Sequence, residues 1–457
     1  MGPFTVLNDN AGWCWFQGPR VIFDAPHETL VCGTVATRDG EGGETRNGNI
    51  EVASCGLAGS GASVAALGNI LLRGRGDDHN APALWQRPDG RFLAVYTGHN
   101  FGAGNGHGPD GTVDSEPLTF YRISSRPHDA TEWEPQQIFA WPADDPVGTD
   151  RISVTYSNLH YLTGQGGDKG RLYNIARAAG HVWQIATSDD WGESWTYRGT
   201  ITLPPAGGRD YSNGYMKFSD NGVDRIDFIT TEAHPRDYNN GIYHGYIQGG
   251  QTFNSAGEVI DPDTFSREAP HPEACAPLFT PGAVAPDSYH HAWTAELRRG
   301  DDGELFALFT TRFGTGRSDV RWPAPGDNDH RLFFGRFDGS SWSTSELAPM
   351  GEGLNWYQED YTGLGSVDPR DGRTVYVSTP IDPRTGARLP HHEIFRAQRG
   401  RHGGVWHWSS FTSNSTTDNL RPQLLPLDND RVMLLWLHGS YDHPHEFRQA
   451  LVARPCE

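Results

Sequence analysis

The stretch Ser188-Asp189-Asp190-Trp191-Gly192-Glu193-Ser194-Trp195 matches the pattern S-x-D-x-G-x-[ST]-W, and it decides the fold. In this pattern, called an Asp box, the Asp and Gly form a tight turn between the outer strands of a sheet, and the Trp packs beneath it. Weaker copies of the hairpin, each with an Asp-Gly pair, occur at 87–91, 301–305, 337–342 and 369–373. One Asp-Gly turn is common in any β protein, but several of them indicate a repeated antiparallel unit.

The composition supports a single repetitive β domain. A chain of 457 residues could hold two or three ordinary domains or one large β domain. Glycine (56) and proline (31) are both frequent, and no window shows a sustained apolar period of 3.6 residues. Short strands between turn residues run along the whole chain, as in 86–96. Blades of about 60 residues would give about seven. We therefore predict an all-β, seven-bladed β-propeller, with residues 1–457 forming one catalytic domain.

Charge and cysteine content exclude several classes of protein. The formal net charge of −20 argues against general binding to nucleic acid, which needs a basic surface. No stretch approaches eighteen consecutive apolar residues, so we expect no membrane span. The cysteines are odd in number, widely spaced and without a C-x-x-C motif, so no disulfide framework is expected; they are Cys14, Cys32, Cys55, Cys275 and Cys456. We expect a monomer.

Five residues at predicted strand edges are candidates for a site. They are His79, His99, Tyr156, Arg171 and His234. Each alone would usually be a structural or solvated residue, but together they come from at least three successive hairpins. Equivalent ends of successive propeller blades converge on the central axis, so these side chains are predicted to face one cleft.

Several runs of the chain resemble one family of enzymes. These runs are 12–20 (GWCWFQGPR), 77–84 (DDHNAPAL), 154–162 (VTYSNLHYL), 221–226 (NGVDRI) and 231–247 (TEAHPRDYNNGIYHGYI). They look like the BNR-repeat propellers that include the ulvan lyases and related rhamnose–uronate lyases, most strongly over 69–248. The resemblance implies a seven-bladed propeller that acts on an anionic glycan of rhamnose and uronic acid. The order and approximate spacing of that family's active-site His, His, Tyr, Arg and His agree with the five candidates.

The residue types suit β-elimination at a uronic acid. The reaction needs a group to neutralise the carboxylate, a base for the C5 proton and an acid for the oxygen leaving C4. Arg171 is the candidate for the carboxylate, His79 for the base and Tyr156 for the acid. Tyr156 could instead perform both proton transfers in a syn elimination. Substrate-binding roles are assigned to Asn80, His99 and His234.

Other functions remain open from the sequence. A sialidase would need three arginines on the substrate carboxylate and a Tyr nucleophile paired with Glu. Arginines such as Arg20, Arg75 and Arg236 are present, but the N-terminal part shows no convincing arginine motif. A hydrolase or exo-lyase acting on rhamnosyl-glucuronate ends of plant gums is a closer alternative. A non-catalytic glycan-binding propeller could use the fifteen tryptophans for stacking.

One further cluster could bind a structural metal ion, either zinc or calcium. It consists of His271, Cys275, His290 and His291, a ligand set that suits tetrahedral zinc. The alternative is a buried thiol with partly exposed imidazoles. The proposed elimination itself requires no cofactor.

The N-terminus lacks a basic segment followed by an apolar segment, so no signal peptide is seen in this sequence. From the predicted function we expect an extracellular or periplasmic protein. A cytoplasmic location stays open.

Overall fold

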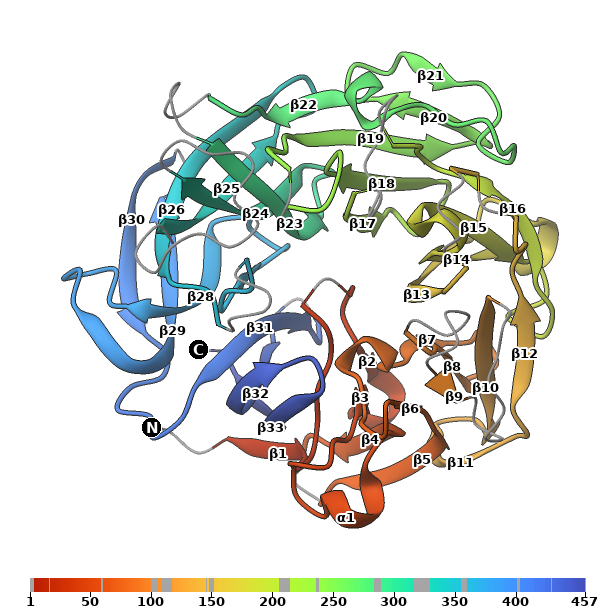
Figure 1. Cartoon of the computed structure of the whole chain (residues 1–457), viewed down its shortest axis with the longest axis horizontal. Helices are drawn as coiled ribbons and strands as arrows, with labels where there is room; N and C mark the ends of the chain where they lie inside the picture. The colour runs from red at the N-terminus through yellow and green to blue at the C-terminus, as the bar shows by residue number, and fades with distance from the viewer. Residues whose placement is uncertain are drawn as a thin grey trace.

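The described part of the chain forms a ring of antiparallel sheets around a central axis (Figure 1). The computed structural model describes residues 4–15, 17–58, 61–99, 106–107, 117–144, 146–147, 152–204, 214–235, 238–282, 289–314, 329–354, 360–400, 403–428 and 430–456. Within these residues, seven sheets have four or more strands each. The chain is therefore a seven-bladed β-propeller, and the predicted fold class is confirmed.

The blades follow one another along the chain, and each begins with its innermost strand. Blade 1 comprises β2 (Val21–Asp24), β3 (Thr29–Val35), β4 (Asn49–Gly56) and β5 (Ser63–Asn69). Blade 2 comprises β7 (Ala83–Gln86), β8 (Phe92–Thr97), β10 (Leu118–Arg126), β11 (Asp129–Trp133) and β12 (Gln137–Ala140). Blade 3 comprises β13 (Thr155–Leu162), β14 (Arg171–Arg177), β15 (Trp183–Ser188) and β16 (Thr196–Thr200). Blade 4 comprises β17 (Met216–Asp220), β18 (Arg225–Thr230), β19 (Ile242–Gln248), β20 (Gln251–Asn254), β21 (Val259–Asp261) and β22 (Ala276–Phe279).

Blades 5 and 6 comprise β23 (Tyr289–Arg299), β24 (Leu305–Gly314), β25 (Asp329–Phe337) and β26 (Trp342–Gly351); and β27 (Gly365–Val367), β28 (Thr374–Ile381), β29 (Arg388–Gly400) and β30 (Gly403–Ser410). Blade 7 comprises β31 (Asn419–Pro426), β32 (Val432–His443), β33 (Glu446–Pro455) and β1 (Thr5–Asn8). The remaining elements are the pair β6 (Leu71–Leu72) and β9 (Gly106–His107), α1 (Gly43–Arg46), and the 3-10 helices Ala25–His27, Asp78–Asn80, Gly167–Lys169, Ala179–His181 and Pro272–Ala274. No helix among the described residues is long and apolar enough to cross a membrane.

The two ends of the chain close the ring in blade 7. The N-terminal strand β1 is the outermost strand of this blade and pairs with the C-terminal strand β33, where Val6 lies opposite Val452. Closure in this way leaves no gap between the first and last blades.

The Asp box forms the expected turn between the outer strands β15 and β16 of blade 3. The carboxylate of Asp190 accepts a hydrogen bond from the backbone N–H of Ser194 at 3.0 Å, and the hydroxyl of Ser188 accepts one from Gly192 at 2.8 Å. The ring of Trp195 packs edge-on against Tyr121 of blade 2, with the centroids 6.3 Å apart. The motif therefore fixes a turn and also a contact between two blades.

The antiparallel order of each blade defines two faces of the ring. We call the end at which the innermost strands begin the starting face, and the other end the opposite face. The second strand of each blade runs back toward the starting face and ends there. Residues that precede an innermost strand, and residues that follow a second strand, therefore gather on the starting face.

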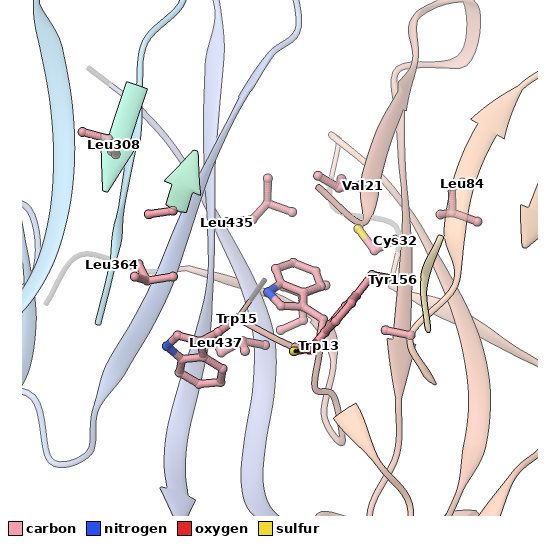
Figure 2. Close-up of a cluster of buried hydrophobic side chains, with 14 of the residues drawn as sticks. Trp13, Trp15, Val21, Cys32, Leu84, Tyr156, Leu308, Leu364, Leu435 and Leu437 are labelled. Atoms are coloured by element: carbon pink, nitrogen blue, oxygen red, sulfur yellow. Dashed lines mark hydrogen bonds between the residues drawn. The ribbon is translucent and has the colours of Figure 1, made fainter. Parts of the chain in front are cut away.

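Residues 13–15 and 17, which we call the central segment, are buried at the centre of the ring. The backbone N–H of Cys14 donates to the carbonyl of Asp78 in the segment leading into blade 2. Trp15 donates to the carbonyl of Thr362 at 2.5 Å, and its ring lies 4.2 Å from that of Tyr441 in blade 7. Figure 2 shows Trp13 and Trp15 within the buried apolar cluster that surrounds the axis. This segment joins blades from across the ring through a shared core.

We expect Trp15→Ala to lower the free energy of unfolding by about 3–5 kcal/mol, because it removes a fully buried aromatic side chain. Val405→Ala, at a site that is 78% exposed, should change it by no more than about 0.5 kcal/mol. Chemical denaturation of both variants measures the difference. Equal stability of the two variants would contradict a stabilising role for the central segment.

Candidate active site

One buried carboxylate, that of Asp77, holds two histidines in a stack. Its Oδ1 lies 2.7 Å from Nδ1 of His79, and its Oδ2 lies 2.8 Å from Nδ1 of His99. The two imidazole rings are parallel to within 8° and 4.0 Å apart. With Nδ1 of each ring directed at Asp77, Nε2 is the nitrogen that remains to accept or donate a proton elsewhere.

The rest of the 77–80 motif fixes these rings in place. Asp78 contacts Nδ1 of His79 at 2.6 Å through one oxygen and accepts a hydrogen bond from the hydroxyl of Tyr441 at 2.9 Å through the other. The side-chain oxygen of Asn80 accepts the backbone N–H of His99 at 2.8 Å. Both aspartates and Asn80 are buried. The two acids therefore orient the histidines rather than only shaping a turn.

Tyr156 lies beside this pair, at the start of β13 in blade 3. Its ring centroid is 5.5 Å from that of His79, and its hydroxyl is 3.8 Å from Sγ of Cys14. The backbone of Tyr156 has φ = 62°, a region that bulky residues rarely adopt, and the strand register shifts there. The amide of Asn158 donates to the Tyr156 carbonyl at 2.5 Å and supports the distorted backbone. Such local distortion re-aims a side chain, here toward the axis.

Arg177, at the end of β14, supplies a positive charge beside Tyr156. Its guanidinium lies 4.6 Å from the ring centroid of Tyr156 and donates to the hydroxyl of Tyr215 at 3.1 Å. His234 meets Tyr215 edge-on at 5.3 Å. The result is a continuous row of rings with one guanidinium beside it, formed in order by His99, His79, Tyr156, Tyr215 and His234.

The structure thus brings four of the five sequence candidates together and separates the fifth. The prediction of Arg171 as the carboxylate-binding residue is wrong in position. Its guanidinium forms two hydrogen bonds with the carboxylate of Asp189, at 2.7 and 2.9 Å. Arg171 begins β14 on the opposite face, six residues and thus about 20 Å along the strand from Arg177.

The ring resembles solved structures of polysaccharide lyases. No protein-family model and no curated protein matches the chain. A structure described as a PL25 ulvan lyase superposes with a TM-score of 0.61 at 13% identity, covering 100% of this chain and 98% of the other. A PL25 ulvan lyase bound to -[GlcA(1-4)Rha3S]- gives 0.53 at 12% identity, covering 98% and 86%. The polysaccharide lyase Uly1 gives 0.56 at 11% identity, covering 96% and 89%. This chain has the fold of the ulvan lyases.

The described residues that were predicted to bind a metal ion make separate contacts. His271 lies near the carbonyl of Leu203, whereas Nδ1 of His291 contacts the carbonyl of Pro235. Cys275 is buried, and burial raises the pKa of its thiol to about 12. The side chain of His290 lies outside the described part of the structure. None of the described residues of this set belongs to a group of three potential ligands, and an ion there stays a prediction.

The charges in the row follow from burial and from the shared carboxylate. Burial lowers the pKa of His79, but the nearby Cys14 and Tyr156 and the carboxylates of Asp77 and Asp78 raise it well above the usual 6.5. Burial and the neighbouring His79 lower the pKa of His99 to about 4. Two stacked imidazolium ions would repel each other, so His79 carries the charge and His99 is neutral near pH 7.

Tyr156 keeps its proton at neutral pH. Burial and the proximity of Cys14 raise the pKa of its hydroxyl well above 10, although His79 and Arg177 act in the other direction. The row therefore contains a neutral histidine, a charged histidine, a protonated phenol and a guanidinium. Asp77, His79 and His99 also place potential metal ligands together, as do Cys14, Asp78 and His79.

Asp77 makes the stability of the fold depend on pH. Burial raises the pKa of Asp77, but His99, His445 and His79 lower it well below 3.8 in the folded chain. The ionised carboxylate therefore stabilises the fold above about pH 4, and this contribution is lost as the pH falls through the folded pKa. We expect Asp77→Asn to cost about 2 kcal/mol at pH 7 and clearly less at pH 3.

Urea denaturation at the two pH values measures this difference, with Asp144→Asn on the exposed surface as the matched control. An Asp77→Asn penalty of the same size at both pH values would show that the ionised carboxylate does not stabilise the fold.

Proposed function

We propose that this protein is a polysaccharide lyase that cleaves a glycan of rhamnose and uronic acid, such as ulvan, by β-elimination. The observation that carries the proposal is the row of His99, His79 and Tyr156 with Arg177 beside it. It combines a base, an acid and a carboxylate-binding cation on one face of the ring. The fold shared with ulvan lyases is consistent with this chemistry but does not establish it.

In the proposed reaction, Arg177 binds the uronate carboxylate and stabilises the negative charge that develops on it. His99 accepts the C5 proton at Nε2, while its Nδ1–H stays bonded to Asp77. The electrons of the C5–H bond form the C4–C5 double bond, and the C4–O bond breaks. Tyr156 gives its proton to the departing oxygen. Solvent then returns a proton to Tyr156 and removes one from His99.

This assignment exchanges the sequence-based roles of the two histidines. A base must be unprotonated, and the neutral His99 meets this condition whereas the charged His79 does not. The exposed fraction of the side chain supports the same choice, since it is 15% for His99 and 6% for His79. His79 would instead stabilise negative charge next to Tyr156. Asn80 and His234 keep their proposed roles in binding the substrate.

Burial sets a condition on how the sugar binds. Tyr156 is only 1% exposed, so a sugar can reach its hydroxyl only after neighbouring side chains have moved. Hydrolysis would need a pair of carboxyl groups beside the glycosidic bond. Asp77 and Asp78 are fully buried and already bonded to His79, His99 and Tyr441, which favours elimination.

The first test is the product formed from a panel of uronate glycans that includes a glucuronate–rhamnose-3-sulfate polymer. Elimination should produce a 4,5-unsaturated uronate, detected by near-UV absorbance and by mass spectrometry. Tyr156→Phe should reduce the rate by at least about 100-fold, because the acid is removed. Products that have gained water and lack a double bond would instead identify a hydrolase. Binding without cleavage would identify a glycan-binding protein.

A matched pair of substitutions on β14 tests the cation. Arg177→Lys should reduce kcat/KM by about 100-fold, since lysine keeps the charge but loses the paired hydrogen bonds to a carboxylate. Arg171→Lys, the same change at the other end of the same strand, should leave kcat/KM near the wild-type value. The reverse result would restore Arg171 as the functional arginine.

The pH dependence tests the base. If His99 accepts the proton, kcat/KM should stay high as the pH falls from 7 and decrease only near pH 4, as its carboxylate-bonded ring becomes protonated. Circular dichroism at each pH controls for unfolding. His99→Ala should lack most of the activity at every pH. A decrease centred near pH 6.5 would show that a histidine with an ordinary pKa is the base.

A further inference from the structure

We infer that a second cluster, formed by Asp24, His27 and His128 on the opposite face of the ring, is a binding site for a divalent transition-metal ion such as Zn²⁺. The ligand atoms of these three residues lie within 4.8 Å of one another. Asp24 ends β2 and His27 closes the following 3-10 helix in blade 1, whereas His128 lies in the turn between β10 and β11 of blade 2. The ion would therefore join two neighbouring blades.

The distances fit a tetrahedral ion. Zinc binds nitrogen and oxygen at about 2.0–2.2 Å, so two ligand atoms of a tetrahedron lie about 3.3 Å apart. Oδ2 of Asp24 is 3.3 Å from Nδ1 of His27 and 3.1 Å from Nδ1 of His128. The two rings face each other with centroids 4.2 Å apart. Both oxygen–nitrogen distances therefore match the spacing of tetrahedral ligands, and the ligand atoms of the three residues all lie within 4.8 Å of one another.

The surroundings of Asp24 favour a bound cation. Its carboxylate is 0% exposed, and its polar side-chain partners in the described part of the chain are Gln86 and the two histidines. A buried carboxylate needs a compensating positive charge, which a divalent ion would supply. Gln86 donates to Oδ1 at 2.8 Å and so helps to fix the carboxylate, while Nδ1 of His128 lies 2.9 Å from Oδ1 and 3.1 Å from Oδ2. Such support around a ligand is typical of metal sites.

The site is open to solvent on one side. The side chain of His27 is 53% exposed, and His27 and His128 both border a cavity of about 550 Å³ between blades 1 and 2. This leaves a path for the ion and room for water in the fourth position. Because the cluster lies on the face away from His99 and Tyr156, the ion would stabilise the contact between two blades and take no part in the proposed elimination.

Zinc binding to the full chain after chelator treatment tests the site, by calorimetry and by measured metal content. The wild type should bind one equivalent through this cluster, and zinc should raise its melting temperature. His27→Ala/His128→Ala should lose that equivalent or bind it at least about tenfold more weakly. Calcium should not replace zinc, because calcium prefers oxygen ligands.

The matched control is His79→Ala/His99→Ala, which removes the histidine ligands of the two groups on the starting face and should retain the equivalent. His27→Ala alone, at an exposed side chain, keeps the test interpretable if the double variant does not fold. Unchanged zinc stoichiometry and affinity in both His27 variants would overturn the inference. So would a wild type that binds no zinc at micromolar concentrations, which would leave the two histidines as hydrogen-bond partners of Asp24.

Discussion

The antiparallel order of the blades is the constraint on which the rest of the structure depends. It places the start of each innermost strand and the end of each second strand on the same face. His79 precedes β7, Tyr156 begins β13 and Tyr215 precedes β17, while Arg177 ends β14. Side chains from three blades thus meet at the ends of their strands. Ring closure by β1 and β33 keeps these strand ends at fixed distances from one another.

Within this frame, the distribution of buried charge decides what the side chains can do. A single carboxylate, Asp77, contacts two stacked imidazoles, and Asp78 adds a second negative charge beside only one of them. Burial lowers the pKa of both rings, but Cys14, Tyr156 and the two carboxylates raise that of His79 well above 6.5, whereas His79 lowers that of His99 further. Two residues of the same type therefore acquire different protonation states, as an acid–base reaction requires. The same arrangement makes removal of Asp77 costly to the fold.

Much of this could be predicted from the sequence, because strand edges and turns leave clear local signals. The seven-bladed ring followed from the Asp box, the Asp-Gly turns and the length of the chain. The gathering of His79, His99, Tyr156 and His234 followed from their positions at strand edges. The predicted placement of Arg171 beside them was wrong, because it depended on which end of a strand faces the site. Leu162 pairs with Arg171 next to the turn of the hairpin. Six residues further from the turn, β13 reaches Tyr156 and β14 reaches Arg177.

The distance of Arg177 and Tyr156 from the turn could have been counted in the sequence, because the glycines of 164–170 mark the turn of the hairpin. Other features could not be found in this way. The shift in register at Tyr156, the sharing of Asp77 between two rings and the pairing of Asp24 with His128 each depend on contacts between residues far apart in the chain. A resemblance in motif order gives the types of residue in a site, but hydrogen-bond partners and strand direction decide which arginine lies beside Tyr156.

The backbone distortion at Tyr156, a positive φ near the start of an innermost strand, also occurs in other blades. A positive φ also occurs at Leu364, just before β27, and at Arg421 in β31. At Arg421 the register of the innermost strand shifts, as it does at Tyr156 in β13. All three side chains are buried. Arg421 donates to the carbonyls of Trp13 and Gln17 in the central segment, whereas Tyr156 contacts His79. A distortion that anchors the central segment in blade 7 therefore also positions the Tyr156 hydroxyl, the proposed acid, in blade 3, and the strain at Tyr156 is balanced by the packing of the whole ring.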